Sequence, residues 1–179
     1  MYVITTERLR LRPLTTAGAD WWVSLHADGE VNRFVGTYTH EQAAARLRAI
    51  EDQWTRRGHG LCAVELTATG EPIGRSGLFW WEQFDETEAG WTFARAHWGQ
   101  GYATEAARAV LGWGFGALGL QQITAMIHHG NTGSTAVARR LGFTPLREDE
   151  LLGRPLTVHS LHRDDHHPAV TAARAAGTL

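Results

Sequence analysis

Apolar and polar positions alternate at the start of the chain and then change to helical spacing. In residues 4–14 leucines alternate with arginines, which predicts a half-buried strand. Helical spacing begins at Thr15, and a second helix is predicted from Thr39 onward. The apolar positions of that second helix are Ala43, Leu47, Ile50 and Trp54. The chain therefore opens with one strand and two helices.

Two apolar stretches in the middle of the chain predict an antiparallel hairpin. They cover residues 61–67 and 72–81, and the turn-like sequence Ala-Thr-Gly-Glu separates them. Another strand is predicted over residues 88–94. These three strands would form the centre of one sheet.

The second half of the chain contains its clearest amphipathic helix. One face of this helix carries Ala103, Ala106, Ala107, Val110, Leu111, Phe115 and Leu118. A strand over residues 122–128, a helix over 132–141 and strands near 144–146 and 156–161 follow. The pattern predicts a single α/β (α+β) domain over residues 1–164. The Ala-rich, polar segment 165–179 is expected to be a flexible tail.

Composition agrees with one soluble domain and limits its partners. The chain has 179 residues, is 43% hydrophobic, and contains no apolar run near the roughly 18 residues of a membrane span. Its 17 basic and 19 acidic side chains give no general attraction for nucleic acid or an anionic membrane. The single cysteine, Cys62, cannot form an internal disulfide, and the start of the chain shows no secretory signal. We therefore expect a cytoplasmic protein with no nucleic-acid or membrane partner.

A Gly-rich turn precedes the amphipathic helix. Its sequence is Trp98-Gly99-Gln100-Gly101-Tyr102-Ala103-Thr104. Small residues allow the backbone to approach a ligand, and the unpaired N–H groups and dipole of the helix start favour a pyrophosphate. A tight turn without a ligand is the alternative. The glycines are followed by no Lys-Ser or Lys-Thr pair, and the preceding strand comes late in the chain, so coenzyme A is the remaining nucleotide.

The chain resembles the GNAT acetyltransferase superfamily, in particular its RimJ/RimL-like branch, from about Ile4 to about His162. Three stretches carry the resemblance: Thr5-Glu7-Arg8-Leu9-Leu11-Arg12, then Trp98 to Ala106, then Asn131 with Ser134, Leu141, Gly142 and Phe143. The resemblance implies a mixed, mostly antiparallel, V-splayed sheet of about six or seven strands with about four helices. It also implies transfer of an acetyl group from acetyl-CoA directly to a primary amine of a protein N-terminus, an amino acid or a small molecule such as an antibiotic.

The same resemblance implies where the cofactor binds. The backbone of the segment after the third central strand would pair with the pantetheine arm, Asn131 would hold it from the other side, and the Gly-rich turn would hold the pyrophosphate. Trp98 replaces the Gln or Arg that usually opens this turn, as is common in this branch. Arg140 is the preferred phosphate contact, although a solvated helix face also explains it. The expected cofactor-binding residues are Phe93, Ala94, Arg95, Trp98, Gly99, Gln100, Gly101, Tyr102, Ala103, Thr104, Asn131, Ser134 and Arg140.

Direct transfer to an amine uses one base and one acid. Glu88 is the candidate base, because it matches the Glu before the Gly-aromatic pair of many relatives. An exposed strand carboxylate or a water chain is the alternative. The Tyr that many relatives use as the acid is replaced here by Ala138. Ser134 could donate to the sulfur instead, or could simply start a helix.

Tryptophans are candidates for acceptor contacts, namely Trp80, Trp81 and Trp91. Because side chains alternate along a strand, Trp80 and Trp81 must face opposite sides. The histidines near the C-terminus show no metal-ligand spacing, so we expect no metal site. An amine-bearing acceptor is the expected partner, and a homodimer is compatible with the resemblance. A non-catalytic acyl-CoA binding module is the alternative function, because the usual acid is missing.

Overall fold

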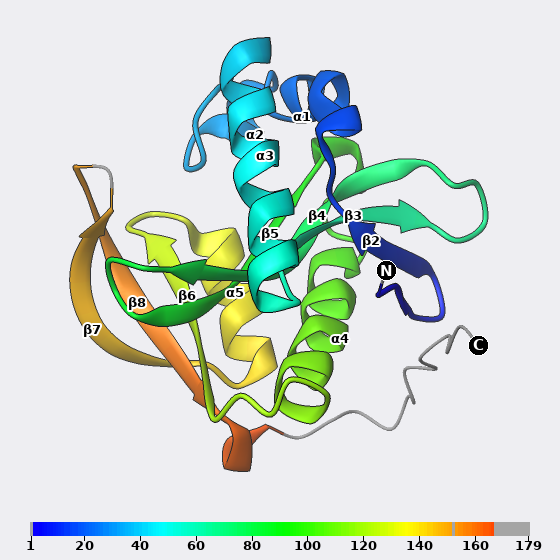
Figure 1. Cartoon of the computed structure of the whole chain (residues 1–179). Coiled ribbons are helices and arrows are strands. Elements are labelled where there is room, and N and C mark those ends of the chain that lie inside the picture. The colour runs from blue at the N-terminus through cyan, green and yellow to red at the C-terminus, as the bar shows by residue number, and fades with distance from the viewer. Residues whose placement is uncertain (1, 152, 167–179) are drawn as a thin grey trace.

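In the computed structural model, which describes residues 2–151 and 153–166, eight strands form one sheet in the order β1-β2-β3-β4-β5-β6-β8-β7 (Figure 1). The strands are β1 (Ile4–Thr5), β2 (Leu9–Pro13), β3 (Leu61–Leu66), β4 (Pro72–Trp81), β5 (Glu86–Phe93), β6 (Gln122–His128), β7 (Thr144–Leu151) and β8 (Arg154–His162). Neighbouring strands run antiparallel, except that β5 and β6 run parallel. This parallel pair creates the opening in the sheet.

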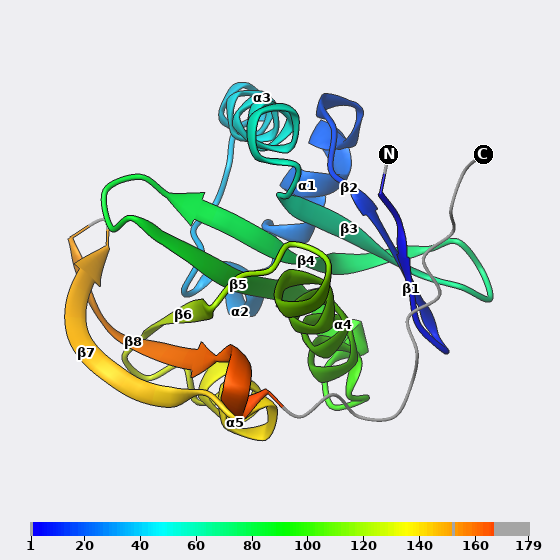
Figure 2. The ribbon, with the colours of Figure 1, turned by 60° about the horizontal axis from the view of Figure 1, so that its bottom comes forward.

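Helices cover both faces of the sheet (Figure 2). They are α1 (Ala19–Leu25), α2 (Gly29–Asn32), α3 (His40–Arg57), α4 (Tyr102–Gly116) and α5 (Thr132–Leu141). A smaller apolar core lies beneath α1 and α3 and includes Trp22, Leu47 and Ile50. The larger core lies on the other face, where α4 and α5 contribute Val110, Leu111 and Leu141.

The gap in the sheet begins where β5 and β6 part. The two strands share one pairing position, Glu88 opposite Thr124. Beyond it β6 pairs along its length with β8, while β5 remains paired with β4. A V-shaped opening therefore widens from Glu88 toward Phe93, as the sequence resemblance implied.

The observed elements confirm the predicted fold class and refine its details. The described residues contain eight strands and five α-helices instead of six or seven strands and four helices. The predicted strand over residues 4–14 is a hairpin, because Thr6 bonds Leu9 through its backbone and its hydroxyl and reverses the chain. The sequence analysis missed α2, a single turn capped by Asp28. The predicted strand 122–128 and helix 132–141 have the observed bounds. Most of the expected tail, residues 165–179, lies outside the described residues.

Candidate active site

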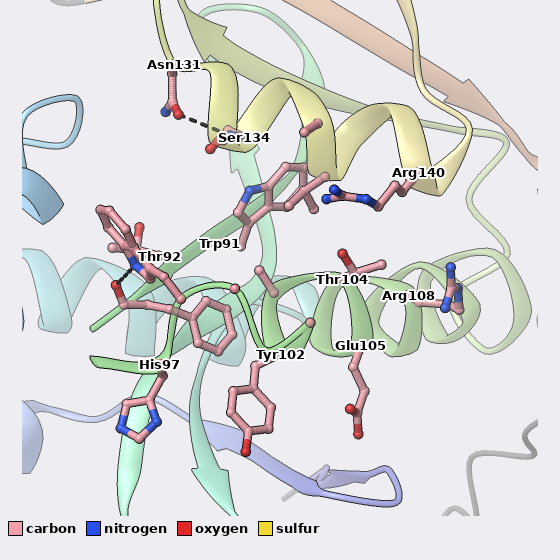
Figure 3. A pocket seen from close by; sticks show the side chains of 18 of the residues that line it. Trp91, Thr92, His97, Tyr102, Thr104, Glu105, Arg108, Asn131, Ser134 and Arg140 are labelled. Carbon is pink, nitrogen blue, oxygen red and sulfur yellow. Dashed lines mark hydrogen bonds between the residues drawn. The ribbon is translucent and has the colours of Figure 1, made fainter. Parts of the chain in front are cut away.

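A cavity of about 1810 Å³ occupies the gap between the splayed strands. One side of it is formed by the starts of α4 and α5, and the other by α2 and the loop after it. Figure 3 shows Trp91 between α5 and the start of α4, with Asn131 and Ser134 at the beginning of α5. The cavity is lined by all the expected cofactor residues except Ala94, Arg95 and Gln100. It extends from the Gly-rich turn to Phe34 in the loop after α2.

The Gly-rich turn presents unpaired backbone donors to this cavity. Gly99 and Gly101 have left-handed φ values of 75° and 83°, which other residues adopt only with strain. Gly101 is the N-cap of α4 and provides no side-chain cap for the helix start. The first α-helical hydrogen bond joins the Glu105 N–H to the Gly101 carbonyl. The N–H groups of the preceding residues, Tyr102 to Thr104, are therefore available to an anion.

Cationic side chains surround the same end of the cavity. Arg108 on α4 and Arg140 on α5 both line it, and in Figure 3 Arg140 lies above Thr104 while Arg108 lies further along α4. Within the described part of the chain neither guanidinium forms an ion pair. The neighbouring Arg139 does not line the cavity, so the geometry favours Arg140 as the phosphate contact. The sequence analysis did not single out Arg108, although it lies one helical turn beyond Thr104.

Arg8 holds the turn in position from the β1–β2 hairpin. Its NH2 and Nε groups contact Glu105 Oε2 at 2.6 and 2.7 Å, and its NH1 donates to the Gln100 carbonyl over 3.1 Å. Thr6 donates a further hydrogen bond of 2.6 Å to Glu105. Burial alone would raise the pKa of Glu105, but the hydrogen bonds from Thr6 and Arg8 lower it. In the sequence Arg8 was only one residue of the first stretch that carries the GNAT resemblance. Its contacts now give it a structural role, because they hold the Gly-rich turn in place.

The free edge of β5 faces the gap. The Ala94 N–H donates to the Ile73 carbonyl of β4, and the Ala94 carbonyl accepts from His97. Antiparallel alternation therefore directs the backbone groups of Trp91 and Phe93 away from β4 and into the gap. The Phe93 carbonyl accepts the Trp98 indole N–H at 2.8 Å. Both backbone groups of Ala94 are bonded within the protein, and its expected pairing with the pantetheine arm stays a prediction.

Asn131 and Ser134 together begin α5. The Asn131 side-chain oxygen accepts the Ser134 N–H over 3.1 Å and so caps the helix. Ser134 lines the cavity, and its hydroxyl makes no hydrogen bond to the described residues. Ala138, one turn later, is fully buried. Ser134 is thus a hydroxyl donor on this helix that is open to a ligand.

Glu88 lies at the apex of the V. Its carboxylate accepts the Trp81 indole N–H at 2.5 Å and the Met126 backbone N–H at 3.4 Å. Burial raises the pKa of Glu88, and the hydrogen bond from Trp81 and the charge of Arg75 oppose this only in part. Glu88 does not itself line the cavity. Thr92, which lies four residues further along β5 on the same face as Glu88, does line it. A carboxylate with a raised pKa suits a general base.

The three candidate tryptophans occupy different places. Trp81 contacts Glu88, whereas the Trp80 ring lies under Arg57 at 4.1 Å. Trp91 lines the cavity on the face opposite Glu88, with its ring 6.5 Å from that of Phe143. Trp91 is therefore placed toward the cofactor side, and Trp81 is the tryptophan next to the base.

Other reactive groups lie apart from the cavity. Cys62 is buried in the core, and burial raises the pKa of its thiol to about 12. In the ranges 2–151 and 153–166 no group of three or more His, Cys, Asp or Glu residues could hold a metal ion. No helix among these residues is long and apolar enough to cross a membrane.

Comparison with known proteins agrees with this geometry. Residues 8–144 match the family described as the acetyltransferase (GNAT) domain. The protein YkkB of Bacillus subtilis (strain 168) is 36% identical over 161 residues, which cover 87% of this chain and 93% of that protein. An acetyltransferase structure from Agrobacterium tumefaciens str. C58 has a TM-score of 0.79 and 34% identity, and the match covers 89% of this chain and 94% of that one.

A similar fold is found in RimL, a ribosomal L7/L12 alpha-N-protein acetyltransferase solved in complex with coenzyme A. The TM-score is 0.76 at 15% identity, over 89% of this chain and 97% of that one. At this identity the likeness concerns the fold alone.

Proposed function

This chain belongs to the GNAT acetyltransferase family, and from that premise we propose that it transfers the acetyl group of acetyl-CoA directly to a primary amine. Members of the family act with acetyl-CoA on amine acceptors. The acceptor amine would belong to a protein N-terminus, an amino acid or a small molecule such as an antibiotic. Cys62, a single buried cysteine, suits a reducing compartment, so we propose the cytoplasm as the place of reaction.

The observation that carries this proposal is the cavity itself. It joins an uncapped helix start to the free edge of β5 and to the Ser134 hydroxyl, all of which could contact one extended ligand. Backbone N–H groups of Tyr102 to Thr104, with Arg108 and Arg140, would bind a pyrophosphate. The backbone groups of Trp91 and the Phe93 N–H, with the Asn131 amide, would bind a pantetheine arm. The residues present therefore fit coenzyme A.

When bound, acetyl-CoA supplies an activated carbonyl carbon and a thiolate leaving group. Glu88 would accept a proton from the incoming amine, because its buried carboxylate has a raised pKa and is held by Trp81 and Met126. Ser134 would donate its hydroxyl proton toward the sulfur in place of the missing Tyr. The acceptor would arrive through the side of the cavity formed by α2 and Phe34.

A thiol-release assay over a panel of amines tests the proposal. We expect thiol release that depends on both acetyl-CoA and an amine, together with an acetylated product detected by mass spectrometry. Calorimetry measures acetyl-CoA binding in parallel. Binding without turnover on any amine would contradict the enzymatic proposal and would support a non-catalytic acyl-CoA binding module. Absence of binding would contradict both functions.

A further inference from the structure

A second polar cluster lies next to Glu88, beneath α1 and α3. Its aromatic part is a stack of Trp22 on His26 at 4.6 Å, with the Tyr38 ring edge-on to both. Its cationic part is Arg75 on β4 and Arg46 on α3. The guanidinium carbon of Arg75 lies 5.3 Å from the Trp22 ring centre, which joins the two parts.

Arg75 reaches over the sheet toward the base. It pairs across the strands with Thr92, and a Cβ atom added to Gly90 would lie 3.6 Å from its NH1 group. Glu88, Gly90 and Thr92 follow one another on the same face of β5. The absence of a side chain at Gly90 therefore leaves room for the Arg75 guanidinium between the base and the edge of the cavity.

Arg46 approaches the same place from α3. Its guanidinium carbon lies 4.2 Å from the ring centre of Phe79, the residue opposite Glu88 on β4. Its charge and that of Arg75 are close enough to Glu88 to affect the pKa of that carboxyl. Arg46 is only partly accessible to solvent.

In the described structure neither arginine is paired directly with a carboxylate, although the charge of Glu88 acts on both. Among the residues that the structure describes, Arg75 and Arg46 form no hydrogen bond and no ion pair, and the Arg75 Nε atom is inaccessible. Burial lowers the pKa of Arg75 to about 10, so it remains protonated at neutral pH. Burial, followed by the charge of Arg75, lowers the pKa of His26 to about 4, so His26 adds no charge. One carboxylate, Glu88, thus stands near two cations.

Uncharged donors of the cluster also lack partners. The Trp22 Nε1 atom and the Thr92 hydroxyl are buried and have no hydrogen-bond partner in the described structure. Thr92 lines the cavity, so the cluster adjoins the site at this residue. Buried donors and unpaired buried charges are costly unless a ligand satisfies them. The cluster therefore has the charge and the donors that bind anionic oxygen atoms.

We infer that the amine acceptor carries an anionic oxygen group close to its amine, and that Arg75 and Arg46 bind this group while Glu88 receives the amine. The inference rests on the proposed acetyl transfer and narrows its acceptor class. Glu88 and Gly90 are two residues apart on one strand, a separation of roughly 7 Å, which suits an amine and an acid joined by a few bonds. An amino acid or an aminoalkyl phosphonate has this chemistry, whereas a polyamine would add positive charge beside both arginines.

Matched acceptor pairs test this inference. We would compare kcat/KM for L-amino acids with that for their carboxamides, and for aminoalkyl phosphonates with that for alkylamines of the same length. We expect the acidic member to be preferred at least tenfold in one of the two series, and that series identifies carboxylate or phosphonate as the bound group. Equal rates within every pair would overturn the inference while leaving acetyl transfer intact. No turnover on any amine would contradict the proposed function as well.

Variants locate the preference in the cluster. Arg75→Gln and Arg46→Gln should each lower the acid-to-amide ratio at least tenfold, whereas Arg75→Lys, which keeps the charge, should retain part of it. Arg57→Gln is the matched control. Like Arg46, Arg57 is on α3, and like Arg75 it lies over an indole, in this case that of Trp80. Thermal denaturation checks that each variant folds. If Arg75→Gln does not fold, Arg46→Gln tests the assignment. An unchanged ratio in a folded Arg75→Gln or Arg46→Gln protein would overturn the assignment.

Binding provides a readout that is independent of turnover. The amine-free carboxylic acid of the preferred amino acid, or the amine-free alkylphosphonate, should raise the melting temperature of the wild-type protein. The same compound should leave the melting temperature of Arg75→Gln unchanged. A shift of equal size in both proteins would contradict a binding role for Arg75.

Discussion

The Trp81 indole N–H donates to Glu88 Oε2 over 2.5 Å, and this bond joins the last residue of β4 to the carboxylate at the apex of the splayed sheet. The bond favours the ionised carboxylate, while burial favours the protonated one. Trp81 is thus both a candidate acceptor contact and a residue that positions and adjusts the proposed base.

Replacement of Trp81 by Phe should move the acid limb of the pH dependence of kcat/KM to higher pH. The variant removes a hydrogen bond that lowers the pKa of Glu88, so this pKa should rise further above its ordinary value. The measurement is a pH profile with one acceptor, so that the ionisation of the amine is the same for both proteins. Trp80→Phe is the control, because the Trp80 indole N–H has no partner among the described residues. Equal shifts in both variants would contradict the assignment.

Glu88→Gln should lower kcat by about 100-fold or more, within the usual range for a general base. The loss should be larger at low pH than at high pH, where more of the amine is already neutral. Rates measured across pH at saturating acetyl-CoA test this. Glu86→Gln is the control on the same strand, where the carboxylate pairs with Arg147 at 2.7 Å. A pH profile that is the same in wild type and Glu88→Gln would remove Glu88 as the base.

Local signals in the sequence were sufficient to predict the Gly-rich turn. Gly99 and Gly101 adopt the left-handed backbone that favours glycine, and α4 begins directly after them. Likewise, Asn131 and Gly142 mark the two ends of α5 through a cap and a left-handed stop. Such features depend on residues a few positions apart, so they can be recognised without the rest of the fold.

Contacts across strands could not be predicted in this way. The bond between Arg8 and Glu105 joins residues 97 positions apart, and the place of Arg75 over Gly90 depends on the register of β4 against β5. In the sequence Arg75 is one of two polar side chains, with Ser76, in an otherwise apolar strand. Trp91 was a candidate acceptor contact in the sequence, and strand alternation places it on the face of β5 opposite Glu88.

Ser134→Ala should lower kcat by about tenfold or more if the hydroxyl assists the departing sulfur, as losses for removed transition-state donors commonly reach 100-fold. The fold should be unaffected, because the helix cap uses the Ser134 backbone N–H and not its hydroxyl. Single-turnover rates separate this effect from product release. Thr135→Val removes the neighbouring hydroxyl, which bonds the Asn131 carbonyl, and should leave kcat unchanged. Similar rates for wild type and Ser134→Ala would assign Ser134 to helix initiation alone.

Glu105→Gln should destabilise the protein at neutral pH by about 1–3 kcal/mol, because it weakens charged hydrogen bonds from Arg8 and Thr6. The pKa of Glu105 is lowered in the folded protein, so its stabilisation is present above the ordinary pKa of a glutamate and is lost as pH falls through the folded pKa. The variant should therefore lose less stability than wild type on acidification. Urea denaturation at several pH values measures this, with Glu41→Gln in the first turn of α3 as the control. Parallel pH dependences in wild type and Glu105→Gln would contradict the expectation.

Gly101→Glu should abolish measurable binding of acetyl-CoA, because a carboxylate at the N-cap of α4 would occupy the free N–H groups and repel a pyrophosphate. The substitution also strains the backbone, since Gly101 has a φ of 83°. Gly58→Glu separates the two effects, because Gly58 has a φ of 71°, has open space around its Cβ position and does not line the cavity. Calorimetric titration with acetyl-CoA should show unchanged affinity for Gly58→Glu and none for Gly101→Glu. If both folded variants bind with wild-type affinity, the pyrophosphate must bind elsewhere than at the start of α4.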